Sequence, residues 1–309
     1  MDRKNRKTQS LRLPAFAKIN LCLDVVRKRP DGYHELRTIF QAISLRDTLS
    51  LSFSPDSETN SFTLESNDRN LPLGPENLVY RAVEAIRREI GFRGSVTAHL
   101  EKKIPVARGL GGGSSDAAAA LIGMLRLTKA TVPLERLLEI AAGLGADIPF
   151  FLFGGRALAV GRGDEIYPLP NMPKQTILVV SPRDTGVSTK EAYEWVSEEL
   201  TKRAEAPKIL RFCALCWSRQ GAGLSNDFEK PVFRRYPRLG EIREGLLKQG
   251  AADAALAGSG SAVFGVFRNP AQARRAARAF PKDSVFVVET LSREDYGRAL
   301  GWRARPALI

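Results

Sequence analysis

The most constraining feature of this sequence is a glycine-rich turn between a strand-like run and an alanine-rich run. Residues 96–104 form the strand-like run, residues 109–113 form the turn, and Ser114, Ser115 and Asp116 precede the alanines. Glycines let the backbone approach a ligand closely, and the N–H groups at the start of a helix attract anions. Ser and Asp are helix-capping residue types, so we expect the helix to begin there. The segment predicts a phosphate-binding loop in a nucleotide-using enzyme.

The spacing of this loop differs from two familiar phosphate-binding motifs. No Gly-Lys-Ser/Thr follows the glycines, as a Walker A loop requires. Ser114 stands where the third glycine of the dinucleotide fingerprint would be. A flexible linker is another interpretation of a glycine run, but a linker would not lie between a strand pattern and a capped helix.

Length and composition indicate a two-domain cytoplasmic protein. A chain of 309 residues with 43% hydrophobic residues can bury a substantial core. No apolar run approaches the roughly 18 residues of a membrane span, and no secretory signal is present. Three cysteines are too few for a disulfide scaffold. Cys213 and Cys216 have C-x-x-C spacing, but no second pair or local histidine completes a zinc site, so we expect buried thiols.

The net charge of +13 raises the hypothesis of nucleic-acid binding. Part of this charge lies in a basic leader, residues 1–10, which we expect to be disordered. The remaining basic residues are spread through the helical segments. We therefore expect a solvated basic surface without a nucleic-acid partner, which also suits an enzyme whose ligands carry phosphates.

The hydrophobic pattern divides the chain near residue 170. Besides the strand-like run 96–104 and the helix after the glycines, the first part has four predicted strands and two predicted helices. The strands are 11–26, 35–44, 48–54 and 61–66, and the helices are 77–90 and 133–142. The second part has four strands and three helices: strands 176–181, 252–257, 262–267 and 284–289, and helices 188–200, 234–249 and 271–280. With one helix as an insertion, the order in the second part fits a split βαβ sandwich.

Three further segments carry residues suited to chemistry. Lys18 interrupts an apolar strand, Asp147 lies among apolar residues, and Gly258–Ser261 forms a second glycine loop. Taken singly, each has an ordinary explanation: a lysine can extend from an edge strand to solvent, and an Asp before Ile-Pro is a common turn former.

Together and in this order, these segments resemble the GHMP kinase superfamily, which phosphorylates sugars, homoserine and isoprenoid precursors. The resemblance extends from about residue 11 to about residue 290. Its motifs are Pro14–Leu21, Arg29–His34, Gly109–Ala118, Gly145–Phe150 and Gly258–Ser261. The glycine loop marks the superfamily, and Asp-Gly-Tyr-His narrows the match to members with a cytidyl substrate. The resemblance implies an α+β fold of two domains: a ribosomal-protein-like ATP-binding domain at 1–170 and a ferredoxin-like split βαβ domain at 171–309.

The implied reaction transfers the γ-phosphate of ATP to the 2-hydroxyl of 4-diphosphocytidyl-2-C-methyl-D-erythritol, in the methylerythritol phosphate route to isoprenoid precursors. Lys18 and Asp147 match the catalytic pair. The aspartate would accept the hydroxyl proton, which requires hydrogen-bond reach. The nearby ammonium favours the ionised aspartate and stabilises charge on the transferring group.

The resemblance also implies the ligand contacts. The ATP-binding residues are Asn77, Pro105, Val106, Ala107, Arg108, Gly109, Leu110, Gly111, Gly112, Gly113, Ser114 and Ser115. Mg²⁺ accompanies the nucleotide near Ser115, without a metal site made by the protein alone. Asn77 matches a position near the adenine, and an N-cap role competes with it. Arg108 departs from the small residues common at its position, and contacts a phosphate or stays exposed.

Tyr33 and His34 match the cytosine-binding pair, and Tyr193 is expected to form the second aromatic wall or to pack in the core. Asn20 would bind the catalytic pair or the substrate diol. Gly258, Ser259, Gly260 and Ser261 would close on the substrate diphosphate or diol. No membrane and no obligate protein partner are implied.

Two alternatives remain open at this point. Another GHMP kinase, for mevalonate or homoserine, would share the glycine loop but has no use for a cytosine site. A nucleic-acid-binding module would share the ribosomal-protein-like architecture and the basic charge, but it gives no reason for Lys18 and Asp147 to match a catalytic pair.

Overall fold

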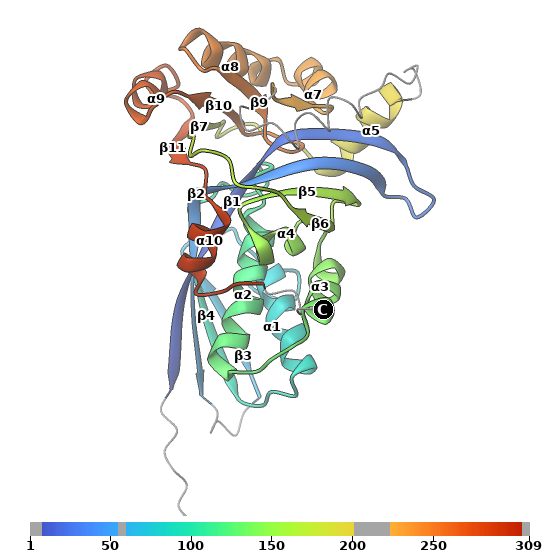
Figure 1. The fold of residues 1–309 in the computed structure, drawn as a ribbon, viewed down its shortest axis with the longest axis vertical. Coiled ribbons are helices and arrows are strands. Elements are labelled where there is room, and N and C mark those ends of the chain that lie inside the picture. The colour runs from blue at the N-terminus through green and yellow to red at the C-terminus, as the bar shows by residue number, and fades with distance from the viewer. Residues whose placement is uncertain (1–7, 55–59, 201–222, 305–309) are drawn as a thin grey trace, which may run out of the picture.

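The computed structural model describes residues 8–54, 60–200 and 223–304. A sheet backed by helices forms the lower part of the molecule in Figure 1, and a second sheet with its own helices lies above it. The N-terminal elements are β1 (Gln9–Lys28), β2 (His34–Ser54), β3 (Phe62–Ser66), α1 (Leu78–Glu89), β4 (Ser95–Glu101), α2 (Gly112–Thr128), α3 (Leu134–Leu144), α4 (Ile148–Phe153), β5 (Arg156–Gly161) and β6 (Glu165–Pro168). The later elements are β7 (Thr176–Ser181), α5 (Thr189–Leu200), β8 (Ser225–Asn226), α7 (Glu229–Arg235), α8 (Pro237–Lys248), β9 (Asp253–Leu256), β10 (Val263–Phe267), α9 (Pro270–Ala277), β11 (Ser284–Glu289) and α10 (Arg293–Leu300).

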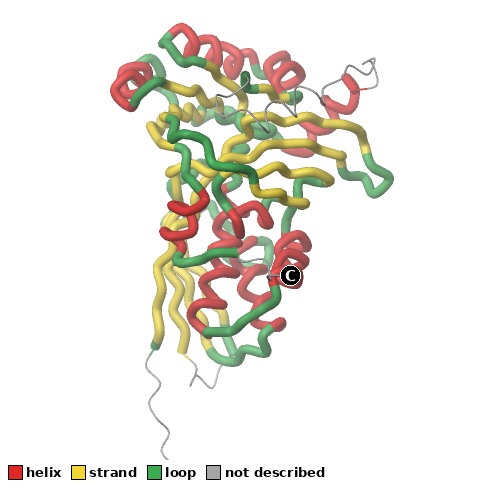
Figure 2. Tube along the Cα trace, viewed as in Figure 1, coloured by secondary structure: helices red, strands yellow, loops and turns green. Residues whose placement is uncertain are grey.

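The two sheets fit the two-domain α+β fold that the resemblance implied, and the upper one also has the predicted split βαβ order. The lower sheet has the order β3-β4-β2-β1-β8, with β5 paired to β2 and β6 paired to β5, and its helices cover one face (Figure 2). The upper sheet has the order β11-β7-β10-β9 and is antiparallel throughout. Its fourth strand therefore lies beside its first, which is the ferredoxin-like split βαβ arrangement.

Strand β2 is one continuous strand, although the sequence predicted separate strands at 35–44 and 48–54. In the structure Asp47 is buried, and its carboxylate accepts hydrogen bonds from the backbone N–H groups of Lys103 and Ile104. Asp47, which lies between the two predicted strands, thus anchors the segment before the glycine loop from within one continuous strand.

Side chains along β1 point alternately to the two faces of the sheet, so one strand contributes both to the apolar core and to the polar face that carries Lys18. Ala17, Ile19 and Leu21 point into an apolar cluster shared with Ile177 and Val179 of the upper sheet. Because successive side chains point to opposite faces, Lys18 and Asn20 are directed away from that cluster. The register between β1 and β2 shifts at three places, two of which flank these polar residues.

The C-terminal segment returns to the N-terminal layer. Tyr296 and Leu300 of α10 are buried in the N-terminal core, and the indole N–H of Trp302 donates to the Leu152 carbonyl. The predicted domain at 171–309 therefore sends its last helix back across the predicted boundary, and α10 itself was not predicted. At the other end, Gln9 and Ser10 of the predicted leader begin β1. Residues 1–7 and the pair Cys213 and Cys216 lie outside the described residues.

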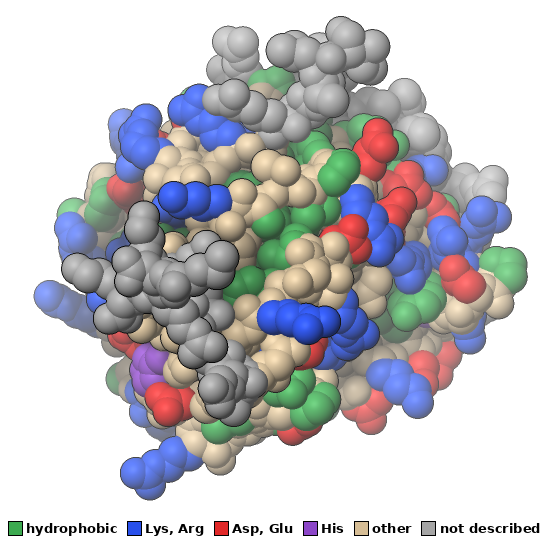
Figure 3. Space-filling view, turned by 90° about the horizontal axis from the view of Figure 1, so that it is seen from below, with side chains coloured by type: hydrophobic (Ala, Val, Ile, Leu, Met, Phe, Trp, Pro, Cys, Tyr) green, Lys and Arg blue, Asp and Glu red, His purple; other side chains and the backbone are tan. Residues whose placement is uncertain are grey.

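The structure can be compared with two expectations from composition: a solvated basic surface and no membrane-spanning segment. Seen from below, Lys and Arg side chains are interspersed with Asp and Glu, without one large patch of a single sign (Figure 3). Among the helices that the structure describes, none combines the length and the apolar character needed to cross a bilayer.

We expect Tyr296→Phe to lower the free energy of unfolding by about 1–3 kcal/mol, because a buried carbonyl loses its partner. The Tyr296 hydroxyl donates to the Phe151 carbonyl at 2.7 Å, in the helix that follows Asp147. Urea denaturation measures the change. Tyr80→Phe is the matched control, since the Tyr80 ring packs on Phe62 and its hydroxyl bonds no described residue. Equal stability of the two variants would contradict the prediction.

Candidate active site

Lys18 lies where four segments of the chain meet. Its backbone N–H donates to the Leu110 carbonyl of the glycine loop at 2.9 Å. Its ammonium donates to Asn20 Oδ1 at 2.9 Å and lies 3.6 Å from Asp147 Oδ2. The Lys18 side chain is only 5% exposed and the Asp147 side chain 35% exposed. The structure therefore brings the two predicted catalytic residues together, with the carboxylate as the more accessible member.

The hydroxyl of Thr38 orients Asn20 toward Lys18. Thr38 Oγ1 donates its single proton to the Cys22 carbonyl at 2.7 Å, so it can only accept from Asn20 Nδ2, which lies 2.8 Å away. The amide nitrogen of Asn20 then faces Thr38, and the amide oxygen faces the lysine. Thr38 was not predicted, because a threonine in a strand carries no sequence signal for such a role.

The two glycine loops touch each other through their backbones. Gly109 has φ +77°, and a Cβ placed on it would lie 1.8 Å from the Ala257 carbonyl oxygen. Gly258 has φ +55°, and its Cβ would lie 3.1 Å from the Gly109 oxygen and 3.4 Å from Lys18 Nζ. Both positions exclude a side chain, so glycine here permits a close approach between the two domains.

A cavity of about 860 Å³ opens above this junction. Its lining includes predicted catalytic and substrate residues and three residues of the predicted ATP-binding loop. The first group is Lys18, Asn20, Tyr33, His34, Asp147, Tyr193, Gly258 and Ser259, and the second is Gly109, Gly111 and Ser114. Four further lining residues were not predicted: Lys28, Arg162, Thr189 and Lys190. Ser261 does not face the cavity, because it is buried and donates to the Thr185 carbonyl. Gly260 is likewise not among the lining residues.

A second cavity, of about 350 Å³, shares Gly109, Gly111 and Ser114 with the first. Its walls include the predicted nucleotide residues Asn77, Pro105, Val106, Ala107, Arg108, Gly109, Leu110, Gly111, Gly112, Gly113 and Ser114. Ser115 is buried behind them and does not line the cavity. The shared glycine loop therefore separates two compartments, as a phosphate-transfer site between a nucleotide and an acceptor requires.

The predicted capping of helix α2 by Ser114, Ser115 and Asp116 is wrong. The helix begins at Gly112, and Gly111 occupies the N-cap position with φ 72° and no side-chain cap. A glycine in the left-handed region turns the chain into the helix without a capping side chain. The N–H groups of the first turn thus have no side-chain acceptor and remain available to an anion.

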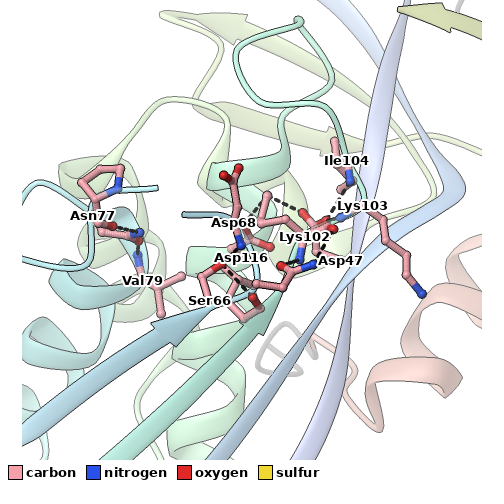
Figure 4. A network of polar contacts seen from close by, with 12 residues as sticks. Asp47, Ser66, Asp68, Asn77, Val79, Lys102, Lys103, Ile104 and Asp116 are labelled. Atoms are coloured by element: carbon pink, nitrogen blue, oxygen red, sulfur yellow. Dashed lines mark hydrogen bonds and ion pairs between the residues drawn. The ribbon is translucent and has the colours of Figure 1, made fainter. Parts of the chain in front are cut away.

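Asp116 instead belongs to a buried triad with Lys102 and Asp47 (Figure 4). Lys102 Nζ lies 2.7 Å from Asp116 Oδ2 and also donates to Asp47. Burial alone would lower the pKa of Lys102, but the two carboxylates raise it above its usual value. Burial raises the pKa of Asp116, and the lysine opposes that effect. Within the described residues, Ser115 Oγ and Asp116 Oδ1 are buried without a hydrogen-bond partner.

Asn77 and Arg108 have clear structural partners. Asn77 caps α1 by accepting the Val79 N–H, so the competing N-cap role is confirmed, and its amide also donates to the Pro72 carbonyl. Arg108 donates to Ser261 Oγ at 2.8 Å. The arginine that departs from the expected pattern thus joins the first glycine loop to the second.

The aromatic residues do not form the expected open sandwich. The His34 ring stacks on the Tyr193 ring with centroids 4.8 Å apart, so that face of Tyr193 is covered. The edge contact between Tyr193 and Phe228 holds the same ring from another side. Tyr33 is 55% exposed, and the Arg162 guanidinium lies 5.0 Å from its ring centroid. Arg162 lies between Gly161 and Gly163, and this Gly-Arg-Gly segment is the signal that could have revealed it.

Known proteins match both halves of this chain. The family model of the GHMP kinases N terminal domain matches residues 77–155, and that of the GHMP kinases C terminal domain matches residues 212–284. A protein of Solibacter usitatus named 4-diphosphocytidyl-2-C-methyl-D-erythritol kinase is 43% identical, over 96% of this chain and 93% of its own length. The chain belongs to this kinase family, within the GHMP kinases.

Other relatives agree with this assignment. A Moorella thermoacetica protein of the same name is 43% identical over 86% of this chain and 93% of its own length. A crystal structure of a 4-(cytidine 5'-diphospho)-2C-methyl-D-erythritol kinase is 37% identical, with TM-score 0.75, and covers 91% of this chain and 99% of that one. A homoserine kinase structure from Cytophaga hutchinsonii, 19% identical with TM-score 0.65, covers 94% of this chain and 96% of that one, and shares the fold alone.

We expect Lys102→Met to lower the free energy of unfolding by about 3–5 kcal/mol, because two buried carboxylates lose their counter-charge. Lys103→Met is the matched control. The Lys103 side chain is 59% exposed and points away from the triad, so its loss should cost less than about 1 kcal/mol. Urea denaturation at neutral pH measures both variants, and similar values for the two would refute a stabilising role for the triad.

Proposed function

We propose that this protein phosphorylates the 2-hydroxyl of 4-diphosphocytidyl-2-C-methyl-D-erythritol with ATP, giving the 2-phosphate and ADP. The observation that carries the proposal is the Lys18–Asp147 pair, 3.6 Å apart, beside the glycine loop that two cavities share. The names of full-length relatives supply the identity of the acceptor.

The geometry supports a direct in-line transfer. Asp147 is exposed to the acceptor cavity and would accept the proton of the attacking hydroxyl. Lys18 lies beside it and would stabilise the charge that develops on the transferring phosphoryl group. Asn20 and Thr38 hold the lysine in place. The first-turn N–H groups of α2 would bind the nucleotide phosphates, and Asn77 lines the same nucleotide cavity.

The residues near the loop fit a magnesium ion shared with the nucleotide. Ser115 Oγ and Asp116 Oδ1 are buried oxygens without a partner among the described residues, and Mg²⁺ prefers oxygen ligands. The part of the chain that the structure describes has no cluster of three or more acidic, histidine or cysteine side chains suited to a metal. The ion would neutralise charge on the phosphates, and the nucleotide would supply its remaining ligands.

The acceptor cavity favours a cytidyl substrate over the smaller acceptors of other GHMP kinases. Tyr33 is 55% exposed and, like His34, lines this cavity. Lys28, Arg162 and Lys190 also line it and supply positive charge for a diphosphate. Mevalonate and homoserine present neither a base nor a diphosphate. The reaction needs ATP and a small molecule but no nucleic acid or protein partner, and a cytoplasmic location fits this proposal.

Asp147→Asn should reduce kcat by about 10²–10⁴, because the amide cannot accept the hydroxyl proton. ATP binding should change little, since Asp147 does not line the nucleotide cavity. The rate of product formation from ATP and the cytidyl substrate measures kcat, and titration calorimetry with ATP measures nucleotide binding. Asp295→Asn is the control, because this exposed carboxylate pairs with Arg298 on α10. Turnover retained in Asp147→Asn would remove the proposed base.

Tyr33→Ala should weaken binding of the cytidyl acceptor by about tenfold or more, because stacking on an aromatic ring is worth about 1–3 kcal/mol per base. The KM for ATP should stay within about twofold of the parent value, since Tyr33 does not line the nucleotide cavity. Tyr167→Ala removes another exposed tyrosine as a control. Equal losses for acceptor and ATP would argue against a cytosine role. Measuring mevalonate and homoserine as competing acceptors in the same assay tests the alternative kinases.

A further inference from the structure

We propose that Ser197 holds His34 in one tautomer and that this tautomer makes the cavity select the 4-amino group of cytosine over the 4-oxo group of uracil. The inference rests on the proposed function, because it concerns how the cytidyl end of the acceptor is read. Ser197 was not predicted, and it acts through His34, so it is a positioning residue.

Toward His34, the hydroxyl of Ser197 can act only as a hydrogen-bond acceptor. Its hydroxyl donates to the Tyr193 carbonyl, one turn earlier in α5, at 2.8 Å. The same oxygen lies 2.6 Å from His34 Nε2. A serine hydroxyl has one proton, which is already donated, so the short contact requires Nε2 to carry the hydrogen.

The other nitrogen of His34 is then an acceptor. In a neutral imidazole only one nitrogen carries hydrogen, so Nδ1 presents a lone pair. Burial, together with the nearby Lys28 ammonium, lowers the pKa of His34 and favours this neutral form. Stacking on Tyr193 holds the plane of the ring, and His34 lines the acceptor cavity. No described residue bonds Nδ1, which leaves it for a ligand.

A hydrogen-bond acceptor at His34 Nδ1 distinguishes cytosine from uracil. Position 4 of cytosine is a hydrogen-bond donor, whereas the same position of uracil is an acceptor. The edge of cytosine offers N3 and O2 as acceptors and the 4-amino group as its donor, so His34 Nδ1 can pair with the amino group. The uracil 4-oxo group would instead face a lone pair, and an unpaired polar group in a cavity is costly.

Nuclear magnetic resonance of the imidazole nitrogens tests the tautomer directly, without any substrate. The chain has two histidines, His34 and His99, and His99→Gln leaves a single signal to assign. Above its pKa, His34 should show the Nε2–H tautomer. Ser197→Ala should give a mixture of tautomers, and Ser197→Thr, which keeps the hydroxyl, should restore the single form. An Nδ1–H tautomer in the parent protein, or no change in Ser197→Ala, would overturn the proposal.

Thr128→Ala is the matched control. Thr128 also donates to a carbonyl one turn earlier in its helix, Met124 at 2.8 Å, but it contacts no histidine. A shift of the His34 signal in this variant as large as in Ser197→Ala would mean that helix structure, and not the hydroxyl contact, governs the tautomer.

Calorimetric binding of CDP and UDP tests the selectivity. CDP should bind more tightly than UDP, and Ser197→Ala should reduce this preference about three- to tenfold, the value of one hydrogen bond. Ser197→Thr should retain it. A preference that Ser197→Ala leaves unchanged would overturn the inference even if the kinase reaction is confirmed. A preference that depends on Ser197 would stand even if the cytidyl acceptor is not phosphorylated, in which case the proposed function alone fails.

Discussion

The site depends on the burial of one charged group, the ammonium of Lys18. A buried charge is tolerated only with partners close by, and here they come both from the same strand and from distant segments of the chain. Asn20 and Asp147 approach the ammonium, Gly258 comes close to it, and the lysine's own N–H bonds Leu110 of the glycine loop. The two domains, the acceptor cavity and the nucleotide loop are thus all placed relative to a single side chain.

Two hydroxyl groups orient the polar side chains on which this arrangement relies. Thr38 and Ser197 each donate their one proton to a backbone carbonyl, so each must accept from the side chain beside it. Thr38 directs the amide oxygen of Asn20 toward Lys18. Ser197 accepts a hydrogen bond from His34 Nε2, which leaves the lone pair of His34 Nδ1 for the cytidyl substrate. Each effect is local, small in energy and directional, which suits the positioning of a catalytic or recognition group.

The sequence predicted the elements that have strong local patterns. The strand at 176–181 and the strand at 284–289 match β7 and β11, and Asn77 caps α1 as its type suggests. The catalytic pair came from a resemblance of ordered motifs. Two errors share one cause, since a polar residue can bond a distant segment. Asp47, between the two predicted strands, anchors the backbone before the glycine loop within one continuous strand, and Asp116 pairs with Lys102 rather than capping α2.

By itself, the sequence determined the family through the order of its motifs. It also determined most strands, because alternating burial is a local pattern, and the glycines at which two backbone segments come close, because only glycine lacks a side chain there. Only the tertiary structure decided that Tyr193 stacks on His34, that the Arg162 guanidinium lies over the Tyr33 ring, and that Arg108 joins the two glycine loops. Those contacts depend on distance and direction between segments far apart in the chain, which residue type and spacing do not specify.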